Sequence, residues 1–352
     1  MTTLADYRDE RLRKLEEIRA RGIDPYPAKS HRNTKISTIL NHFDEKDGQE
    51  VVVAGRIMAI RSFGKLAFVK IRDYTGEVQI FMEKTDQVED GHFSVKELKL
   101  LDTGDFIEAA GRVGKSSTGE ISVFSNQVRL LTKSLRPLPG HDGFKNKEER
   151  YRRRYVDMNV NPEVRERLVR RSKFWQATRN FMNSKGFIEV NTPVLELTTG
   201  GADATPFTTH MDALDIDYYL RISQELPLKR LLGGGFEKVY DIGPRFRNEG
   251  VDDEHLPEHI AFESYAAYEN YEDGMALYEE MIKYVAKETW GTLQFHVGDF
   301  DIDLDCEWPR IKYADLLMEK FGIDVFSLNR QKALSILKEN GVQIDPSVAD
   351  GR

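Results

Sequence analysis

The spacing of apolar residues changes along this chain of 352 residues, and the change predicts two kinds of element. Near the N-terminus, large apolar side chains recur at intervals close to a helical turn, which predicts one amphipathic helix over residues 4–21. Gly22 and Pro25 follow and end this helix. From Val51 to Leu131, short runs of alternating apolar and polar residues predict strands separated by glycine-containing turns.

Five strands are predicted in that region, over residues 51–60, 66–73, 76–83, 104–113 and 119–131. A short helical stretch at residues 94–101 falls between the third strand and the fourth. Five strands with a helix at this position predict a small closed Greek-key barrel of the OB type, whose sheet face binds oligonucleotides.

Alternation along the second and third strands places two phenylalanines on the less apolar face. Phe68 lies there beside Lys70, and Phe81 lies beside Gln79. Aromatic rings among polar and basic neighbours are typical of a base-stacking platform. The alternative is that the rings pack beneath a loop or the N-terminal helix, and it fits Phe81 better than Phe68.

Residues 109–116 nearly spell a phosphate-binding P-loop. Such a loop needs a helix directly after it, so that backbone N–H groups and the helix dipole face the phosphates. Here Thr118 and Gly119 make a turn and another strand follows. We therefore predict a hairpin and no nucleotide site.

The remaining pattern divides the chain into regions. Residues 137–160 form a polar connector, and a long helix is predicted at 162–185 with Pro162 in its first turn. Strands and helices alternate after it. The predicted fold class is α+β, with an N-terminal helix and extension (1–48), the barrel (49–136), the connector (137–160) and a larger α+β domain (161–352).

Composition limits the classes of function. The net charge is −8, yet residues 145–185 hold thirteen Lys or Arg against five Asp or Glu, which suits a protein that meets phosphate on one side. A solvated charged face explains the same run equally well.

One cysteine, Cys306, excludes an intrachain disulfide and a cysteine-rich metal site. No apolar run of membrane-spanning length and no secretory signal is found, so we expect a cytoplasmic protein without a membrane partner.

The densest polar pattern lies in residues 234–271, which we interpret as two antiparallel strands joined by a long loop. Alternation gives the first strand a face of Arg245, Arg247 and Glu249 and the second a face of His259, Glu263 and Tyr265. Such a set on a central sheet is unfavourable unless the charges pair or a ligand satisfies them. A structural ion-pair network is the alternative, but it would not need His255 and His259 at the entry to the second strand.

The guanidinium of Arg247 is a planar fork that suits a phosphate. No Ser-His-Asp, Cys-His or metal-ligand cluster is found in the sequence. The chemistry predicted is therefore electrostatic positioning on a phosphate rather than covalent catalysis.

Several motifs in order carry a family resemblance that covers essentially all of the chain. FRNE at 246–249 resembles motif 2 of class II aminoacyl-tRNA synthetases, and GFIEVNTPVLE at 186–196, with Pro193, resembles motif 1. Three further runs are similar to lysyl-tRNA synthetases in particular, namely residues 200–215, residues 219–243 and the RNEG…EHLPEH segment. The N-terminal helix and the connector also resemble those of lysyl-tRNA synthetases.

The resemblance implies a role for each matching residue. For ATP it implies Arg247 on the α-phosphate, Glu249 on the adenine side, His255 near the terminal phosphates, and His259 in the same site. For L-lysine it implies Arg247 on the carboxylate, Glu225 on the α-amino group, Gly201 lining the pocket and Tyr265 toward the ε-ammonium. Glu263 is a further predicted lysine-binding residue. For the tRNA anticodon it implies stacking on Phe68, with Gln79, Glu120 and Arg56 as further contacts.

The reaction implied is activation of lysine by Mg·ATP and transfer of the lysyl group to a lysine-accepting tRNA. Residues 49–136 would be the anticodon-binding domain and 161–352 the catalytic domain. Motif 1 implies a homodimer. Motif 3 is not found in the sequence, and the family's magnesium ligands and its carboxylate for the ε-amino group would lie beyond Arg352. We therefore expect no metal site within these residues and a chain that is inactive or severely impaired alone.

Other positions also depart from the family pattern. His259 stands where the family usually has an aromatic that stacks on adenine, and Ser223-Gln224-Glu225 replaces the commoner Ala-Pro-Glu. Leu256 replaces an Asn and Thr205 an Arg. A non-catalytic RNA-binding protein that keeps the barrel is the alternative function. An aspartyl or asparaginyl enzyme of the same subclass is disfavoured by residues 200–207 and the N-terminal helix.

Overall fold

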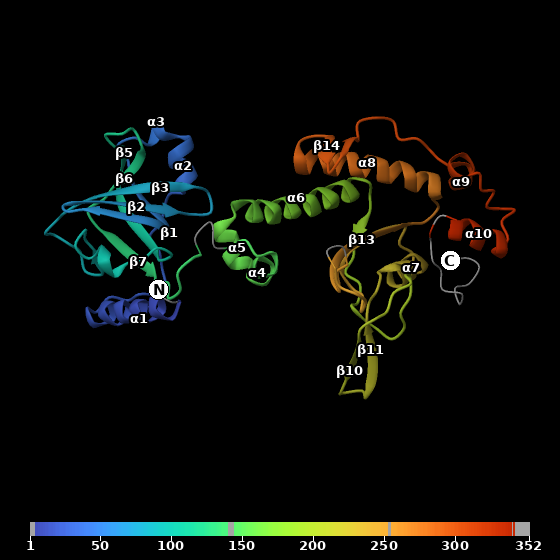
Figure 1. Ribbon diagram of the computed structural model, residues 1–352, viewed down its shortest axis with the longest axis horizontal. Coiled ribbons are helices and arrows are strands. Elements are labelled where there is room, and N and C mark those ends of the chain that lie inside the picture. Colours follow the sequence, from blue (N-terminus) through green and yellow to red (C-terminus); the bar gives the residue numbers. More distant parts are fainter. Residues whose placement is uncertain (1–3, 140–143, 253–254, 340, 342–352) are drawn as a thin grey trace. The chain divides into compact units, whose positions relative to one another are not determined.

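The computed structural model describes residues 4–139, 144–252, 255–339 and 341 (Figure 1). The chain divides into two compact units, Met1–Arg165 and Glu166–Arg352. Each unit is described by itself. No helix in the part of the chain that the structure describes is long and apolar enough to span a membrane.

The first unit begins with helix α1 (Leu4–Ala20), as predicted. Two short helices follow, α2 (Ile36–Asn41) and α3 (Phe43–Lys46). Ile18 of α1 and Ile36 and Ile39 of α2 are fully buried in the core of the barrel unit. The helices thus contribute to one hydrophobic core together with the strands.

The strands close into the predicted barrel. They are β1 (Glu50–Phe63), β2 (Leu66–Arg72), β3 (Glu77–Glu83), β4 (His92–Phe93), β5 (Phe106–Lys115), β6 (Ile121–Phe124) and β7 (Val128–Thr132). Their order is β1-β2-β3-β6-β5-β7-β4, and a further pairing of β1 with β5 closes the ring. The inward positions of β2 and β3, such as Val69 and Ile80, are completely buried.

The structure refines two predictions in this unit and confirms a third. The predicted fifth strand is two strands, β6 and β7, because the chain leaves the ladder at residues 125–127. The predicted helix at 94–101 shrinks to the 3₁₀ turn η1 (Leu98–Leu100). The hairpin prediction for residues 109–116 is confirmed, since Lys115 of β5 pairs with Ile121 of β6.

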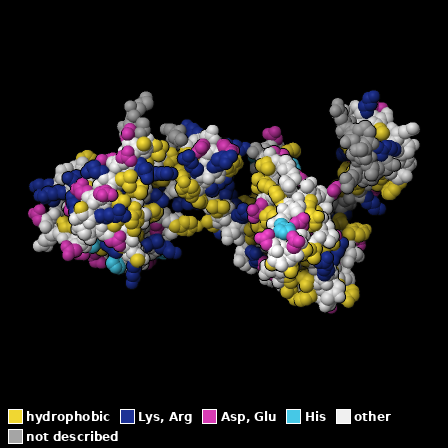
Figure 2. All heavy atoms as spheres, turned by 90° about the horizontal axis from the view of Figure 1, so that it is seen from below, with side chains coloured by type: hydrophobic (Ala, Val, Ile, Leu, Met, Phe, Trp, Pro, Cys, Tyr) yellow, Lys and Arg dark blue, Asp and Glu magenta, His cyan; other side chains and the backbone are white. Residues whose placement is uncertain are grey.

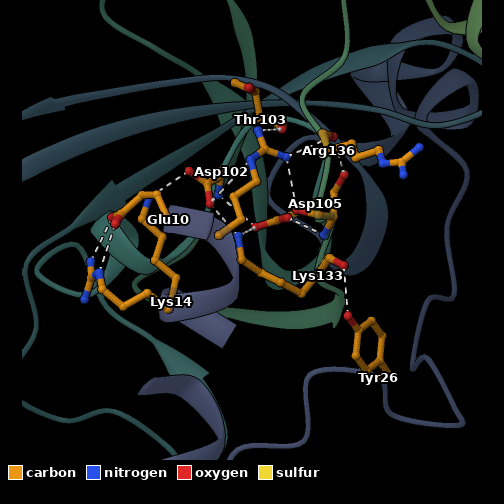
Figure 3. Close-up of polar contacts among 11 residues, drawn as sticks. Glu10, Lys14, Tyr26, Asp102, Thr103, Asp105, Lys133 and Arg136 are labelled. Atoms are coloured by element: carbon orange, nitrogen blue, oxygen red, sulfur yellow. Dashed lines mark hydrogen bonds and ion pairs between the residues drawn. The ribbon is translucent and has the colours of Figure 1, made fainter. Parts of the chain in front are cut away.

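Helix α1 is fixed to the barrel by a buried charged cluster (Figure 3). Lys133 Nζ lies 2.5 Å from Asp102 and 2.8 Å from Asp105, and Lys14 Nζ of α1 lies 2.7 Å from Asp102. Arg11 of α1 donates hydrogen bonds to the carbonyl oxygens of residues 103, 134 and 136. These bonds satisfy backbone acceptors that the helix would otherwise bury.

The segment predicted as a connector contains two helices, α4 (Lys147–Arg152) and α5 (Arg154–Val160). Its arginines pair with neighbouring carboxylates, namely Arg150 and Arg154 with Asp157, Arg152 with Glu148 and Arg153 with Glu149. Basic and acidic side chains are also interspersed on the face shown in Figure 2. For residues 150–154, internal pairing therefore accounts for the charge run.

The second unit consists of small sheets and helices. Its helices are α6 (Pro162–Ser184, from the unit boundary onward), α7 (Glu225–Gly233), α8 (Tyr271–Trp290), α9 (Tyr313–Phe321) and α10 (Arg330–Glu339). Its strands are β8 (Ile188–Glu189), β9 (Leu195–Glu196), β10 (Thr208–Met211), β11 (Ile216–Leu220), β12 (Lys238–Phe246), β13 (Glu258–Ala266), β14 (Gln294–Val297) and β15 (Phe300–Asp303). The described sheets have the orders β10-β11-β9, β13-β12-β8 and β14-β15.

The core of this unit lies on one face of the β12–β13 pair. Tyr240 of β12 packs with Phe181 of α6 and Val285 of α8, and Phe262 of β13 packs against the same cluster. Asn270 and Asp273 form a capping box that fixes the start of α8. Because one face of the strand pair is covered with hydrocarbon, the opposite face is left for polar side chains.

Candidate active site and nucleic-acid interface

The register of β12 and β13 brings the predicted polar face together. Arg245 lies opposite His259, Asp241 opposite Glu263, and Val239 opposite Tyr265. Directly opposed residues of antiparallel strands share a face. Three of the predicted site residues, His259, Glu263 and Tyr265, therefore stand on one surface, away from the hydrocarbon core.

Arg247 and Glu249 lie just beyond β12, and not on it as predicted. Arg247 N donates to Pro257 O at 2.9 Å, which extends the ladder, but Asn248 N then donates to Thr205 O at 2.8 Å and turns the chain away. The Thr205 N–H also donates to Glu249 Oε1 at 3.3 Å. The Nε of Arg247 is buried and has no hydrogen-bond partner among the described residues.

Arg245 is the centre of the polar face. Its Nε donates to His259 Nε2 at 2.9 Å, and its Nη1 lies 3.5 Å from Glu263 Oε1. Burial and the charge of Arg247 lower the pKa of Arg245, and burial and the charge of Arg245 lower the pKa of His259. His259 therefore stays neutral at pH 7 with Nε2 as acceptor, beside two guanidinium groups.

An acidic corner faces these arginines. Burial and the neighbouring Glu225 raise the pKa of Glu263. Burial, the carboxylates of Glu225 and Glu263, and a hydrogen bond to Glu225 raise the pKa of Tyr265. Glu225 Oε1 also lies 2.5 Å from Lys229 Nζ of the same helix. Two carboxyl groups and a phenol at one corner are suited to binding an ammonium ligand, which would compete with Lys229 for Glu225.

Gln224 joins this corner to the sheet, although it was not among the predicted site residues. Its backbone N–H donates to Glu263 Oε1 at 3.2 Å, and its Nε2 donates to the carbonyl oxygens of Gly243 and Ala261 at 3.3 and 3.4 Å. A proline at this position could not donate the backbone bond. The departure from the family's Ala-Pro-Glu was the only sequence signal for this contact.

Gly201 closes the corner from outside the sheet. Its φ is +83°, and a Cβ there would lie 2.2 Å from Ser223 Oγ and 2.5 Å from Glu225 Cβ. A side chain at 201 would therefore fill the space beside Glu225 as well as strain the backbone. His255 lies apart from this corner, in the exposed loop, where its Nδ1 is 2.8 Å from Asp252.

The outer face of the barrel carries a row of aromatic rings. Phe68 of β2 lies opposite Phe81 of β3, and Phe81 opposite Phe124 of β6. The ring centroids are 6.0 Å apart for Phe63–Phe68, 5.2 Å for Phe68–Phe81 and 5.1 Å for Phe81–Phe124. Phe63 is exposed, and the other three rings are half-buried, so part of the row is accessible to flat ligands.

Polar side chains border the aromatic row. Gln79, beside Phe81 on β3, donates from Nε2 to Ser122 Oγ at 3.0 Å. Glu120 is exposed in the β5–β6 turn. Arg61, which the sequence analysis did not select, is exposed on β1 directly opposite Phe68.

Arg56, in contrast, is not at the aromatic row. It pairs in register with Arg72, four residues beyond Phe68 along β2, a distance of about 13 Å in a strand. Its Nη1 donates to Gly104 O at 3.0 Å, and its guanidinium lies 4.3 Å from the centre of the Phe106 ring. The structure thus separates Arg56 from Phe68, Gln79 and Glu120.

Comparison with protein families decides the assignment. Residues 146–341 match the family described as tRNA synthetases class II (D, K and N). The chain belongs to this class II synthetase family. Residues 51–131 match the OB-fold nucleic acid binding domain, which agrees with the closed barrel and its aromatic row.

Among curated proteins, the class II synthetase chain is similar to enzymes named lysine--tRNA ligase. It is 45% identical over 341 residues to the one from Pelotomaculum thermopropionicum, covering 96% of this chain and 67% of that protein. It is 42% identical over 351 residues to the one from Thermotoga maritima, covering 97% and 69%. With the relative from Dehalococcoides mccartyi the identity is 43% over 346 residues, covering 96% and 69%.

A buried support lies beneath the polar face of this synthetase. Arg221 donates to Asp241 at 3.1 Å, to Thr192 Oγ1 at 2.7 Å and to Pro244 O at 2.7 Å. A Cβ on Gly243 would lie 2.1 Å from the Arg221 guanidinium, so only glycine fits there. The network joins the motif 1 segment to β12 and fixes the strand that presents Arg245.

Proposed function

We propose that the chain acts as a lysine--tRNA ligase. The observation that carries the proposal is the arrangement on β12, β13 and α7, where guanidinium groups stand at one side and an acidic corner at the other. One side suits phosphate and carboxylate, and the other suits the amino groups of lysine. The similarity to proteins named lysine--tRNA ligase supports the same substrate.

In the first half-reaction, a carboxylate oxygen of lysine attacks the α-phosphorus of ATP and the bond to the β-phosphate breaks, releasing pyrophosphate. Arg247 binds the α-phosphate and the lysine carboxylate, since its Nε is buried without a partner among the described residues. Two anions that repel each other are thereby held together by one cation. Glu249 binds the adenine side of ATP, and His255 binds near the terminal phosphates.

Lysine is oriented by its two ammonium groups. Glu225, at the start of α7, receives the α-ammonium, and Gly201 leaves room for it. Glu263 and Tyr265 lie toward the ε-ammonium. His259 stacks on adenine in place of the usual aromatic, and its neutral ring avoids a further charge beside Arg245. In the second half-reaction, a hydroxyl of the tRNA 3′-terminal ribose attacks the lysyl carbonyl carbon and AMP leaves.

Magnesium belongs to the substrate Mg·ATP in this proposal. The described residues contain no group of three or more His, Cys, Asp or Glu side chains suited to a metal ion. When bound, Mg²⁺ supplies charge neutralisation on the phosphates.

On the barrel, the aromatic row stacks on anticodon bases of a lysine-accepting tRNA. Phe68 supplies the central ring, and Gln79 and Glu120 read base edges. Arg61 takes the position near the row that we had expected for Arg56, because it lies opposite Phe68. Stacking of one base contributes about 1–3 kcal/mol, so Phe68→Ala should weaken binding of an anticodon stem-loop about 10-fold or more.

A homodimer through motif 1 completes the proposal. Ile188, Leu195 and Leu197 of this segment are exposed, beside a cavity of about 600 Å³ lined by Pro193, Leu195 and Leu197 among others. Exposed apolar groups of this kind mark an interface. Sedimentation of the chain should give a dimer, and Leu195→Glu should give a monomer.

Lysine-dependent ATP–pyrophosphate exchange tests the proposed reaction. The exchange is measured with this chain and with a chimaera. The chimaera joins this chain to the part of the Thermotoga maritima relative that does not align with it. Exchange with lysine but not with aspartate or asparagine supports the proposal. Binding of tRNA without exchange by either protein would favour the non-catalytic RNA-binding alternative.

A further inference from the structure

A cavity lies in the barrel unit beside Arg56 of β1 and Arg72 of β2, four residues along β2 from Phe68 of the aromatic row. Its volume is about 460 Å³. Four arginines line it, Arg32, Arg56, Arg72 and Arg165, together with Asp73 and other residues.

Two of the arginines are already paired. Arg32 Nη2 lies 2.5 Å from Asp73, and Arg72 lies 2.5 Å from Glu77. Arg72 also donates from Nη1 to the carbonyl oxygen of Asn159 at 2.9 Å. Their charges are therefore compensated within the fold.

The other two arginines, Arg56 and Arg165, form no ion pair with the described residues, although the charge of Asp105 acts on Arg56 from a greater distance. The bond that Arg56 makes is to the neutral Gly104 carbonyl, and its guanidinium lies over Phe106. Burial and the charge of Arg72 lower the pKa of Arg56. The Nε of Arg165 is buried and has no hydrogen-bond partner among the described residues. Two partly desolvated guanidinium groups at one cavity form an unfavourable arrangement unless an anion joins them.

We propose that this cavity binds a phosphate group of the RNA backbone, held by Arg56 and Arg165. A guanidinium fork matches the oxygens of a phosphate in geometry as well as in charge. Arg56 pairs with Arg72 of β2, and Arg72 lies about 13 Å along that strand from Phe68. The RNA bases would therefore be bound at one end of β2 and the RNA backbone at the other. The inference rests on the proposed function, in which the barrel binds tRNA.

Salt dependence of binding separates a phosphate contact from a base contact. Each phosphate contact to a single strand contributes about 0.7 to the slope of log K against log salt concentration. For an anticodon stem-loop, Arg165→Gln should reduce the slope by about that amount and weaken binding about 10-fold at low salt. The double variant Arg56→Gln, Arg165→Gln should reduce it about twice as much.

The loss should be equal for the cognate stem-loop and for one with an altered anticodon, because a phosphate carries no sequence information. Arg165→Lys keeps the charge and should retain the slope while losing affinity. Arg13→Gln is the control, since Arg13 is an exposed arginine of the same unit that pairs with Glu10. Unfolding curves of each variant exclude a general loss of structure.

A competition experiment identifies the source of the phosphate. Pyrophosphate is added to the wild-type chain, and the Nε–H signals of the arginines are followed by NMR with and without stem-loop RNA. Shifts of Arg56 and Arg165 with RNA are the expected result. Shifts with pyrophosphate alone would assign the cavity to a free polyphosphate instead, and an unchanged salt slope with no shift from either would overturn the phosphate site. Loss of anticodon discrimination in Phe68→Ala tests the proposed tRNA function separately from these outcomes.

Discussion

The charged cluster beneath α1 and the polar face of β12 and β13 differ in how their buried polar groups are satisfied. In the barrel unit, the charged cluster beneath α1 is internally satisfied, since Lys133 contacts both Asp102 and Asp105 and backbone carbonyls accept from Arg11. On the β12–β13 face of the second unit, buried polar atoms are left without partners among the described residues, namely Arg247 Nε and Gln224 Oε1.

The pKa values of Asp102 and Glu263 are shifted in opposite directions, whereas burial raises the pKa of Asp105 in the barrel cluster as it raises that of Glu263. Burial opposes the charge of Asp102, but hydrogen bonds from Lys133 and Lys14 hold its pKa below the ordinary value. In Glu263, burial prevails and the pKa is raised. A cluster that stabilises a fold is thus satisfied from within, whereas a ligand site keeps groups that only the ligand satisfies.

The largest expected effect is loss of the barrel cluster. Lys133→Ala leaves the fully buried Asp105 without its cation, which should destabilise the first unit by about 3–5 kcal/mol. All three tryptophans lie at residues 175, 290 and 308, so their fluorescence follows the second unit, and hydrogen exchange must follow the barrel. The double variant Lys133→Met, Asp105→Leu should recover most of the stability. An equal loss in both variants would show that the charges themselves are unimportant.

The counterpart in the second unit is Arg247→Met. Because Arg247 Nε has no partner among the described residues, the free energy of unfolding should change by less than about 1 kcal/mol. Affinity for ATP should fall about 10- to 100-fold, as expected for loss of a charged hydrogen bond. Calorimetric titration with ATP measures the affinity, and Arg310→Met, at an exposed arginine paired with Glu279, is the control. A large destabilisation would show that Arg247 stabilises the fold instead of serving ligand binding.

Acid should weaken the barrel through Asp102. Because its folded pKa is lowered, its contribution is fully present above the unfolded pKa and is lost as the pH falls through the folded value. Asp102→Asn should therefore destabilise the first unit by about 1–2 kcal/mol at pH 7, and the difference from wild type should shrink below about pH 4. Hydrogen exchange at both pH values measures it. A difference independent of pH would contradict the lowered pKa.

The smallest effect is expected from Glu263→Gln, with the opposite sign. A carboxyl group with a raised folded pKa loses stabilising contribution as the pH rises through that pKa, so the ionised form is unfavourable at pH 8. The variant should be more stable than wild type at pH 8 by up to about 1 kcal/mol and should bind lysine more weakly. Urea unfolding followed by tryptophan fluorescence at pH 5 and pH 8 tests this, with Glu272→Gln at the exposed start of α8 as control.

The sequence was sufficient to predict most helices and strands and to predict which side chains share the polar face of β12 and β13. Period-two alternation predicts which residues share a side, and His259, Glu263 and Tyr265 do share one. It could not predict where β12 ends, because that depends on the bond from Asn248 to the distant Thr205. Nor could it show that the backbone N–H of Gln224 contacts Glu263.

The barrel shows the same limit at Arg56 and Arg61. Strict alternation would place these two residues on opposite faces of β1. A bulge between Ile57 and Ala59 shifts the register, so that Arg56 pairs with Arg72 and Arg61 with Phe68 on the same outer face. One extra residue in a ladder leaves no clear signal in the sequence, yet it decides which arginine lies beside the aromatic row.

The attachment of α1 has a practical consequence for dissecting the chain. A recombinant fragment cut at residue 49, where the strands begin, would lack Lys14 and Arg11. The carboxylate of Asp102 would then retain a single lysine, and the carbonyl oxygens of residues 103, 134 and 136 would lose their donor. The smallest fragment that keeps the barrel folded should accordingly start at the first residue of the helix, and shorter versions should aggregate.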